Sequence, residues 1–171
     1  MIRLGALFAV VFGAMIVEAR RAASNEKSQR ARGGIEPRHD VYALMQVAYP
    51  GVFLAMLGEG LFRQPPPLSA LAAGIVGFTL GKLLKWWAIV TLGPFWTFRV
   101  IVVPGSTAVS GGPYKYLRHP NYVGVLGELI GSALIAGAPV AGPLGTALFA
   151  GLMLMRVRVE NRALNAILRR G

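Results

Sequence analysis

One stretch of the chain gathers aromatic, cationic and imidazole side chains between two long apolar runs. It reads Gly-Pro-Tyr-Lys-Tyr-Leu-Arg-His-Pro-Asn-Tyr over residues 112–122. Pro120 directly precedes an apolar run, so we expect it in the first turn of a helix, where its missing N–H is harmless. His119 then lies beside the helix N-terminus, which suits an anion, and Arg118 adds a cation. The tyrosine rings can hold a ligand cation or an aromatic base.

Two prolines bracket this stretch and restrict its backbone. Because a proline disfavours helix at the residue before it, Gly112 and His119 are expected to be extended. The same residue types also fit a simpler role, since tyrosine, lysine and arginine gather at membrane interfaces. Composition alone favours such a juxtamembrane anchor, with the ligand site as the alternative.

Three charged residues outside this stretch are further candidates. Glu128 lies within an apolar run, where a carboxylate is either functional or bound to another helix, for example by a salt bridge to Lys82 or Lys85. Arg156 and Glu160 lie four residues apart, on one face of a predicted helix. They form either an ordinary i,i+4 ion pair or a site. In such a site Arg156 would orient an anionic group, while Glu160 engages a cation or accepts a proton.

The elements that position these residues are predicted to be membrane-spanning helices. The chain has 171 residues, of which 54% are hydrophobic and 15% charged, against about 25% charged in soluble domains. Five apolar segments are expected to be helices, at about residues 4–17, 41–61, 68–90, 123–136 and 140–155. We therefore expect an all-α polytopic bundle of about five transmembrane helices.

A single membrane domain, residues 1–171, is expected to comprise three parts. These are three spans with their loops (1–90), a polar and broken loop (91–122), and a helical hairpin with a basic C-terminal segment (123–171). Residues 20–40 are predicted to form a solvated loop, because they are polar and contain glycine and proline. His39, in this loop, is given no role.

Glycines and lysines in the apolar segments carry further expectations. Gly77 with Gly81, and Gly127 with Gly131, have the four-residue spacing that lets helices approach closely. Lys82 and Lys85 are expected to extend toward the membrane interface.

The distribution of basic residues predicts the topology. The net charge is +11, and most basic residues lie in the loop after the first segment, the loop after the third, and the C-terminal segment. The positive-inside rule then places these three on the cytoplasmic side, with the N-terminus outside and the C-terminus in the cytoplasm. No basic face of a soluble fold is visible, which argues against nucleic-acid binding. The chain has no cysteine, which excludes thiol catalysis, and no metal site is predicted.

Two blocks of the sequence resemble the isoprenylcysteine carboxyl methyltransferase family. GPYKYLRHPNYVG (residues 112–124) is followed, one helical hairpin later, by RVRVEN (residues 156–161). The family has GPY-x-x-x-RHP-x-Y-x-G, then an apolar hairpin, then R-x-x-x-E-E. LGPFWTFRVIVVPG (residues 92–105) is similar to the small bacterial branch associated with alkylpyrone methylation. The resemblance covers residues 92–168. Asn161 replaces the family's usual second glutamate, which shifts the weight onto Glu160.

The resemblance implies an integral-membrane methyltransferase that uses S-adenosyl-L-methionine (SAM). The residues implied in cofactor binding are Trp96, Gly112, Pro113, Tyr114, Leu117, Arg118, His119, Pro120, Asn121, Tyr122 and Glu160. Those implied in catalysis are Glu160, Arg156 and Arg99. The two arginines would hold an anionic acceptor head, and Glu160 is the nearest base for an acceptor that must lose a proton.

The expected acceptor is a lipophilic small molecule, methylated at an oxygen of a carboxylate, enol or phenol, with its apolar part between helices. A bacterial cytoplasmic membrane is the expected location. Methylation of a phospholipid amine is an alternative, which acidic residues in the acceptor cleft would favour and arginines would oppose. A non-catalytic membrane scaffold is another, supported by Asn161 alone. The enzyme hypothesis requires His119 and Glu160 to lie close together.

Overall fold

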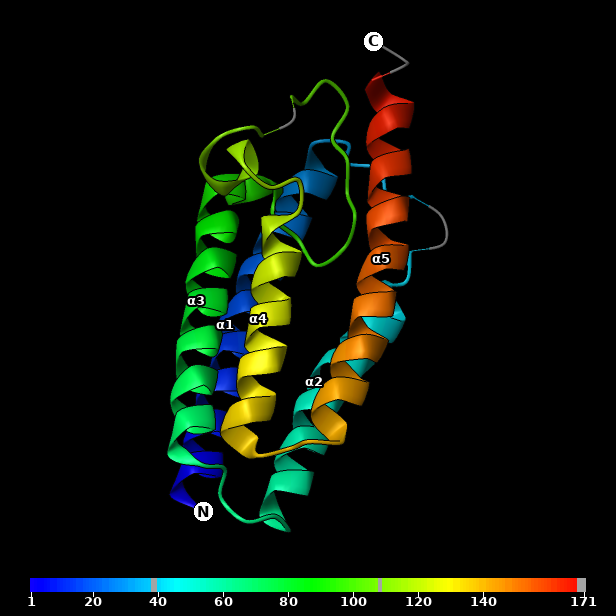
Figure 1. The fold of residues 1–171 in the computed structure, drawn as a ribbon. Helices are drawn as coiled ribbons and strands as arrows, with labels where there is room; N and C mark the ends of the chain where they lie inside the picture. The colour runs from blue at the N-terminus through cyan, green and yellow to red at the C-terminus, as the bar shows by residue number, and fades with distance from the viewer. Residues whose placement is uncertain (38–39, 108, 169–171) are drawn as a thin grey trace.

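The fold is described from a computed structural model, over residues 1–37, 40–107 and 109–168, with side chains up to residue 163. Its helices are α1 (Ile2–Ala31), α2 (Tyr42–Leu61), α3 (Leu68–Leu92), α4 (Pro120–Ala136) and α5 (Ala141–Leu168). Two 3-10 turns, η1 (Gly93–Phe95) and η2 (Gly112–Lys115), lie between α3 and α4. The described residues form no strand beyond one isolated bridge between Ile35 and Val102. The expected all-α bundle is confirmed (Figure 1). His39, Arg169 and Arg170 lie outside the described residues.

Within the described residues, three helical segments are long and apolar enough to cross a membrane: α1, α2 and Leu68–Phe95, which joins α3 to η1. Helix α4 is apolar but shorter, at 17 residues. The count of five spans stays a prediction. The α4–α5 hairpin is present as expected, because Gly137 ends α4 with a left-handed φ of 67° and the chain turns back at once.

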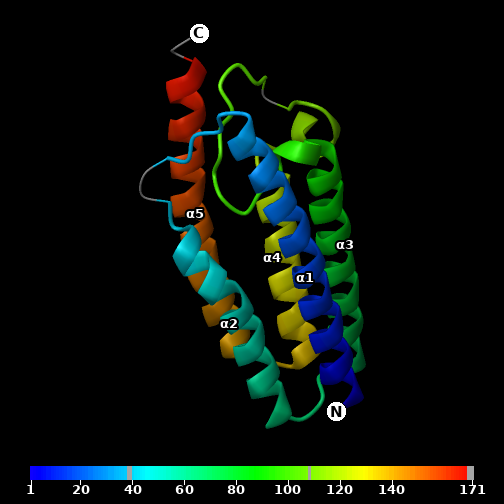
Figure 2. The same cartoon turned by 180° about the vertical axis from the view of Figure 1, so that it is seen from behind.

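The helices alternate in direction, so the three basic segments lie at one end of the bundle. Figures 1 and 2 show the end of α1, the loop between α3 and α4, and the end of α5 gathered there. The N-terminus and the α2–α3 and α4–α5 turns lie at the opposite end. The sequence motifs before α4 and near the end of α5 therefore share one end of the molecule.

The predicted loop over residues 20–40 is wrong in its first half, because α1 continues to Ala31. Asn25 and Gln29 lie on this extension. Their side-chain amides donate hydrogen bonds of 2.8 to 2.9 Å to backbone carbonyls of the segment that follows α3. These distant acceptors stabilise a polar helix that local sequence alone does not favour.

Glycines let α3 and α4 approach until their backbones touch. A Cβ on Gly81 would lie 2.7 Å from the Gly124 carbonyl oxygen, and one on Gly131 would lie 2.4 Å from the Phe78 nitrogen. Real Cβ atoms do not approach backbone this closely. The close approach predicted for Gly81 and Gly131 is confirmed, whereas Gly77 has room, with its nearest neighbour at 4.0 Å.

A buried cluster of charges lies beside this contact. Lys85 Nζ is 2.7 Å from Glu18 and 3.4 Å from Glu128, and Lys82 Nζ is 3.0 Å from Glu128. Tyr49 donates a 2.7 Å hydrogen bond to Glu128. The expectation that the lysines extend toward the interface is wrong, because two buried carboxylates attract them inward. The salt-bridge interpretation of Glu128 is confirmed.

The backbone before α4 is only partly as expected. Helix α4 begins at Pro120 as expected. His119 directly precedes it outside helical geometry, but with φ −133° and ψ 63° it is not extended either. Gly112 is not extended, however, but opens η2 with a φ of 55°. A Cβ at Gly112 would lie 2.5 Å from Thr91 Oγ1, so glycine suits this turn both by its conformation and by its size.

Candidate active site

His119, Tyr122 and Glu160 meet at the end of the bundle where the basic segments gather. Glu160 Oε2 lies 3.6 Å from His119 Nδ1 and accepts a 3.1 Å hydrogen bond from the Tyr122 hydroxyl. The His119 and Tyr122 rings stack with centroids 5.6 Å apart. The start of α4 positions the two rings, and the last turns of α5 position the carboxylate. The helical hairpin therefore brings the two sequence blocks together.

The Tyr114 hydroxyl borders this trio, and Asn121 lies next to Tyr122 in the first turn of α4. Burial, together with the nearby Glu160 carboxylate, raises the pKa of the Tyr114 hydroxyl above its usual range. Tyr114 therefore stays protonated at physiological pH and can donate a hydrogen bond. The Asn121 Oδ1 atom is buried and finds no hydrogen-bond partner in the described part of the chain. An unpaired buried acceptor is costly, so a donor supplied by a ligand would stabilise this end of α4.

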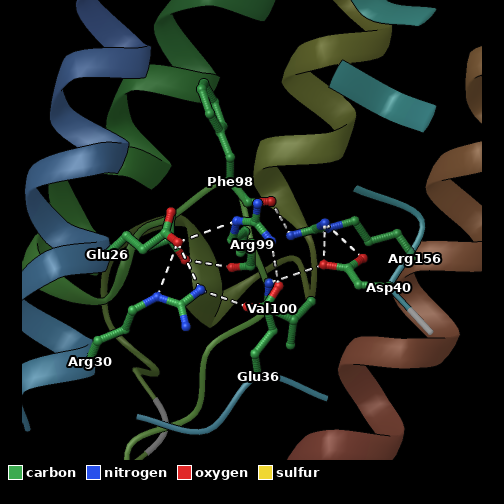
Figure 3. A network of polar contacts seen from close by, with 9 residues as sticks. Glu26, Arg30, Glu36, Asp40, Phe98, Arg99, Val100 and Arg156 are labelled. Atoms are coloured by element: carbon green, nitrogen blue, oxygen red, sulfur yellow. Dashed lines mark hydrogen bonds and ion pairs between the residues drawn. The ribbon is translucent and has the colours of Figure 1, made fainter. Parts of the chain in front are cut away.

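Arg156 does not pair with Glu160, although the two lie one helical turn apart. Its guanidinium donates to both oxygens of Asp40, at 3.0 and 2.9 Å, and to the Phe98 carbonyl oxygen (Figure 3). The Arg156 and Asp40 side chains are both almost fully buried. The i,i+4 ion pair is absent from the described residues, which leaves Glu160 to His119 and Tyr122. Arg156 instead fastens α5 to the start of α2 and to the loop after α3.

Arg99 lies in a neighbouring network of charges (Figure 3). Its guanidinium is 2.8 Å from Glu36 and 3.2 Å from Glu26, and it covers the Tyr42 ring at 4.7 Å. Arg30 reaches the same Glu36 carboxylate at 2.6 Å. Both arginines expected to bind the acceptor, Arg99 and Arg156, are thus held by carboxylates of this chain.

The other residues expected to bind the cofactor lie in different surroundings. Trp96 is buried in a separate cluster with Ala22 and Ile89, where its ring meets that of Phe98 edge-on. Pro113 and Pro120 are buried, whereas Leu117 and Arg118 lie at the surface. The structure therefore gathers His119, Tyr122 and Glu160, with Tyr114 beside them, and places Trp96 in the core.

Asp40, Glu26 and Glu36 hold the two arginines, a role that the prediction of a solvated loop did not give them. One indication was available, because the chain has only seven acidic residues against 18 basic ones. In so basic a chain each carboxylate is a candidate ion-pair partner.

Comparison with known proteins assigns the chain to a family. The family profile described as isoprenylcysteine carboxyl methyltransferase (ICMT) matches residues 72–166. The chain belongs to the ICMT family. This match extends from the second turn of α3 nearly to the end of α5 and includes every residue of the trio. Membership, together with the three apolar helical segments, identifies an integral membrane protein and indicates a methyltransferase.

Two relatives match the chain in sequence over most of their length. The chain is 31% identical over 159 residues to the uncharacterized protein YpbQ of Bacillus subtilis, and the aligned region covers 92% of this chain and 94% of the relative. It is 23% identical over 142 residues to an uncharacterized protein of Haemophilus influenzae, which covers 82% and 83%. No solved structure matches the chain.

Proposed function

We propose that this ICMT-family protein transfers a methyl group from SAM to an oxygen atom of a lipophilic acceptor. The reaction would take place where His119, Tyr122 and Glu160 meet. The observation that carries the proposal is that the α4–α5 hairpin brings the two family blocks together. One block precedes α4 and the other lies late in α5, and Glu160 lies 3.6 Å from His119. A juxtamembrane anchor needs no such convergence.

The described residues fit the charges of SAM. The cofactor has a carboxylate, an ammonium group, a sulfonium and an adenine. Arg118 and the N-terminus of α4 suit the carboxylate. The Glu160 carboxylate suits the ammonium group. The rings of Tyr114 and Tyr122 suit the sulfonium or the adenine.

The chain's own residues mainly position the reactants. Bound SAM supplies a methyl group on a positively charged sulfur, ready for in-line displacement by an acceptor oxygen. His119 and Tyr122 fix the orientation of Glu160, because both contact the same carboxylate oxygen. An anionic oxygen needs no base, whereas a phenol or enol would give its proton to Glu160.

Arg156 and Arg99 suit a positioning role better than direct contact with the acceptor, because carboxylates already hold both. The Arg156–Asp40 pair fixes the turn of α5 that precedes Glu160. The arginine thereby sets the position of the carboxylate without touching the reacting atoms.

SAM binding to the purified protein, measured by titration calorimetry, tests the proposal. His119→Ala and Glu160→Gln are each expected to weaken SAM binding about tenfold or more, because a charge-assisted contact contributes ~1.5–3 kcal/mol. Lys115→Ala is the control, because Lys115 is an exposed cation of the same stretch and lies outside the trio. It should bind SAM as the wild type does.

Two results would contradict the proposal. A folded wild-type protein that neither binds SAM nor gains thermal stability from it would favour the scaffold alternative. Normal SAM affinity in both trio variants would mean that the cofactor lies elsewhere.

A further inference from the structure

A small hollow at the basic end of the bundle carries two arginines that the proposed reaction does not use. The hollow, of about 220 Å³, lies between Val41 at the start of α2 and the last turns of α5, two helices that lie side by side (Figures 1 and 2). Its lining on α5 is Met155, Arg158, Val159 and Arg162. No carboxylate in the described residues pairs with either arginine. The hollow therefore presents two cations whose charge the described part of the chain leaves uncompensated.

The hollow lies on the side of α5 opposite the candidate active site. Its lining residues on this helix, 155, 158, 159 and 162, are three and four apart and therefore share one helix face. Glu160 is two residues from each arginine, which places it about 160° away around the helix axis. Glu160 faces His119 and Tyr122, whereas the hollow faces the start of α2. An anion bound by these arginines is thus neither SAM nor the methyl acceptor.

The two arginines lie at the level of the lipid headgroups. Helix α5 has no charged residue from Ala141 to Met155, and Arg156 is its first charge. The boundary of the hydrocarbon layer is therefore expected near Met155. At a rise of about 1.5 Å per residue, Arg158 and Arg162 lie about 4.5 and 10.5 Å beyond this boundary. Because the headgroup layer is about 5–8 Å thick on each side of a bilayer, the arginines bracket the level of the phospholipid phosphates.

The lining of the hollow suits a phospholipid headgroup better than a free anion. Two arginines one helical turn apart can both donate charge-assisted hydrogen bonds to one phosphate. Val41, Met155 and Val159 add an apolar wall, which suits the glycerol and the first methylene groups of an acyl chain. A free phosphate gains nothing from such a wall. The Asp40 carboxylate, next to Val41 in the chain, is already held by Arg156 at 2.9 Å.

We propose that this hollow binds an anionic phospholipid of the bilayer, with the lipid phosphate between Arg158 and Arg162. Basic pockets between helices recognise such headgroups on the cytoplasmic side, where anionic lipids give the membrane surface a negative potential. The lipid contacts both the start of α2 and the last turns of α5, the two elements that Asp40 and Arg156 also join. It is a structural ligand and no substrate, and the content of anionic lipid in the bilayer sets how firmly these elements are held together.

Photolabelling in phosphatidylcholine nanodiscs tests the position of the lipid. The probe is a trace of phosphatidylglycerol with a diazirine near the glycerol end of one acyl chain, and we expect crosslinks at Val41 or at residues 155–159. Arg158→Gln/Arg162→Gln should fold, because both side chains are exposed, and should lower this labelling about fivefold or more.

Arg20→Gln/Lys27→Gln is the matched control, because it also removes two exposed cations, here from the second half of α1. It should leave the labelling at the hollow unchanged. Equal labelling of the two double variants would overturn the proposal.

Competition distinguishes an anionic lipid from other sources of phosphate. Unlabelled phosphatidylglycerol should displace the probe, whereas inorganic phosphate in solution should not. Displacement by inorganic phosphate would mean that the hollow binds a soluble anion, which would overturn the assignment to a lipid. A diazirine phosphatidylcholine that labels the same residues as strongly as the phosphatidylglycerol probe would overturn the requirement for an anionic headgroup.

Thermal unfolding tests the structural role. Replacing part of the phosphatidylcholine by phosphatidylglycerol should raise the Tm of the wild type by about 2–4 °C, because a ligand of the folded state stabilises it. The gain should persist in Arg20→Gln/Lys27→Gln and be lost in Arg158→Gln/Arg162→Gln. A gain of equal size in all three proteins would contradict a specific site.

SAM titration of the same samples separates this proposal from the methyl transfer. In phosphatidylcholine, Arg158→Gln/Arg162→Gln should bind SAM as the wild type does, because both arginines lie opposite Glu160 on α5. Weaker SAM binding in this variant would place the arginines in the cofactor site and overturn their assignment to a lipid. A wild type that binds phosphatidylglycerol as expected but no SAM would contradict the methyl transfer alone.

Discussion

Glu36 shows how single charges order the loop beside the site. Its carboxylate joins Arg30 near the end of α1 to Arg99 in the loop after α3. Partial burial would raise the pKa of Glu36, but hydrogen bonds from Arg99 and Arg30 outweigh this and lower the pKa below its ordinary value of 4.5. A lowered pKa in the folded state means that ionised Glu36 stabilises the fold above pH 4.5. This contribution is lost as the pH falls through the folded-state pKa.

Glu36→Gln is therefore expected to destabilise the protein at neutral pH and to have a smaller effect in acid. At pH 7 the Tm of the variant should lie about 2–4 °C below that of the wild type, the shift typical of ~1 kcal/mol in a chain of this size. At about pH 3 the difference should be smaller than at pH 7, because the wild-type carboxyl loses its charge as the pH falls through its lowered pKa. Thermal unfolding in detergent measures both values. An undiminished difference at pH 3 would show that the charge of Glu36 is irrelevant.

The positions of single side chains were predictable only where a motif carried them. The proline at position 120 predicted that His119 would border a helix N-terminus, and the two family blocks predicted that His119 and Glu160 would be close. The Arg156–Asp40 pair was not predictable, because it joins residues 116 positions apart. No local rule relates such residues, and the sequence pattern gave no reason to distinguish Asp40 from the other acidic residues of the predicted loop.

At the level of elements, backbone contact between α3 and α4 decides where the buried charges lie. A Cβ at Gly81 would meet the backbone of Gly124 and Glu128, and a Cβ at Gly124 would meet that of Lys85. The same close approach thus brings the helix backbones of Lys85 and Glu128 together. Their side chains can then interact inside the bundle rather than extend to its surface.

Two alanine substitutions one turn apart on α3 test this contact. Gly81→Ala should cost about 3 kcal/mol of unfolding free energy, because its Cβ would meet backbone at 2.7 and 2.8 Å, which cannot move aside. Gly77→Ala should be neutral or slightly stabilising, because its nearest neighbour is 4.0 Å away and alanine favours helix. Unfolding by denaturing detergent compares them. Similar losses for both would mean that the helices do not touch at Gly81.

Apolar runs predicted the elements well, and polar segments did not. The runs placed α2, α3, α4 and the start of α5 within a few residues, because length and hydropathy are local properties. The extension of α1 to Ala31 was missed for the opposite reason. Asn25 and Gln29 gain their partners from carbonyls 65 to 71 residues further along the chain. A helix that depends on such distant acceptors cannot be predicted from the pattern of its own residues.

In the molecule as a whole, one charge cluster connects four of the five helices. Glu18 belongs to α1, Tyr49 to α2, Lys82 and Lys85 to α3, and Glu128 to α4. The opposite charges compensate each other only if α1, α3 and α4 are in place, and Tyr49 of α2 adds its hydrogen bond to Glu128. The cluster therefore couples the packing of α1 and α2 to that of the α3–α4 pair.

Lys85→Met is expected to destabilise the protein by about 3–5 kcal/mol, because it leaves two buried carboxylates with one remaining cation. The double variant Glu18→Gln/Lys85→Met should lose clearly less unfolding free energy than the sum of the losses of the two single variants. Each single change leaves the other residue of the pair buried without its partner, and the double change does not. Lys115→Met, at an exposed position, is the control. Denaturing-detergent titrations of the wild type, the two single variants and the double variant complete the double-mutant cycle. Strict additivity of their unfolding free energies would exclude the coupling.

The cluster pairs two ammonium groups with two carboxylates, so its net charge is zero. A transmembrane voltage acts on a net charge in the bilayer with about 2.3 kcal/mol per 100 mV, and here the opposing forces cancel. The bundle should therefore keep the same stability in energised and de-energised cells, even though its interior is strongly polar. Removing any one of these four ionised groups would leave an uncompensated charge and make the packing of the helices sensitive to the voltage.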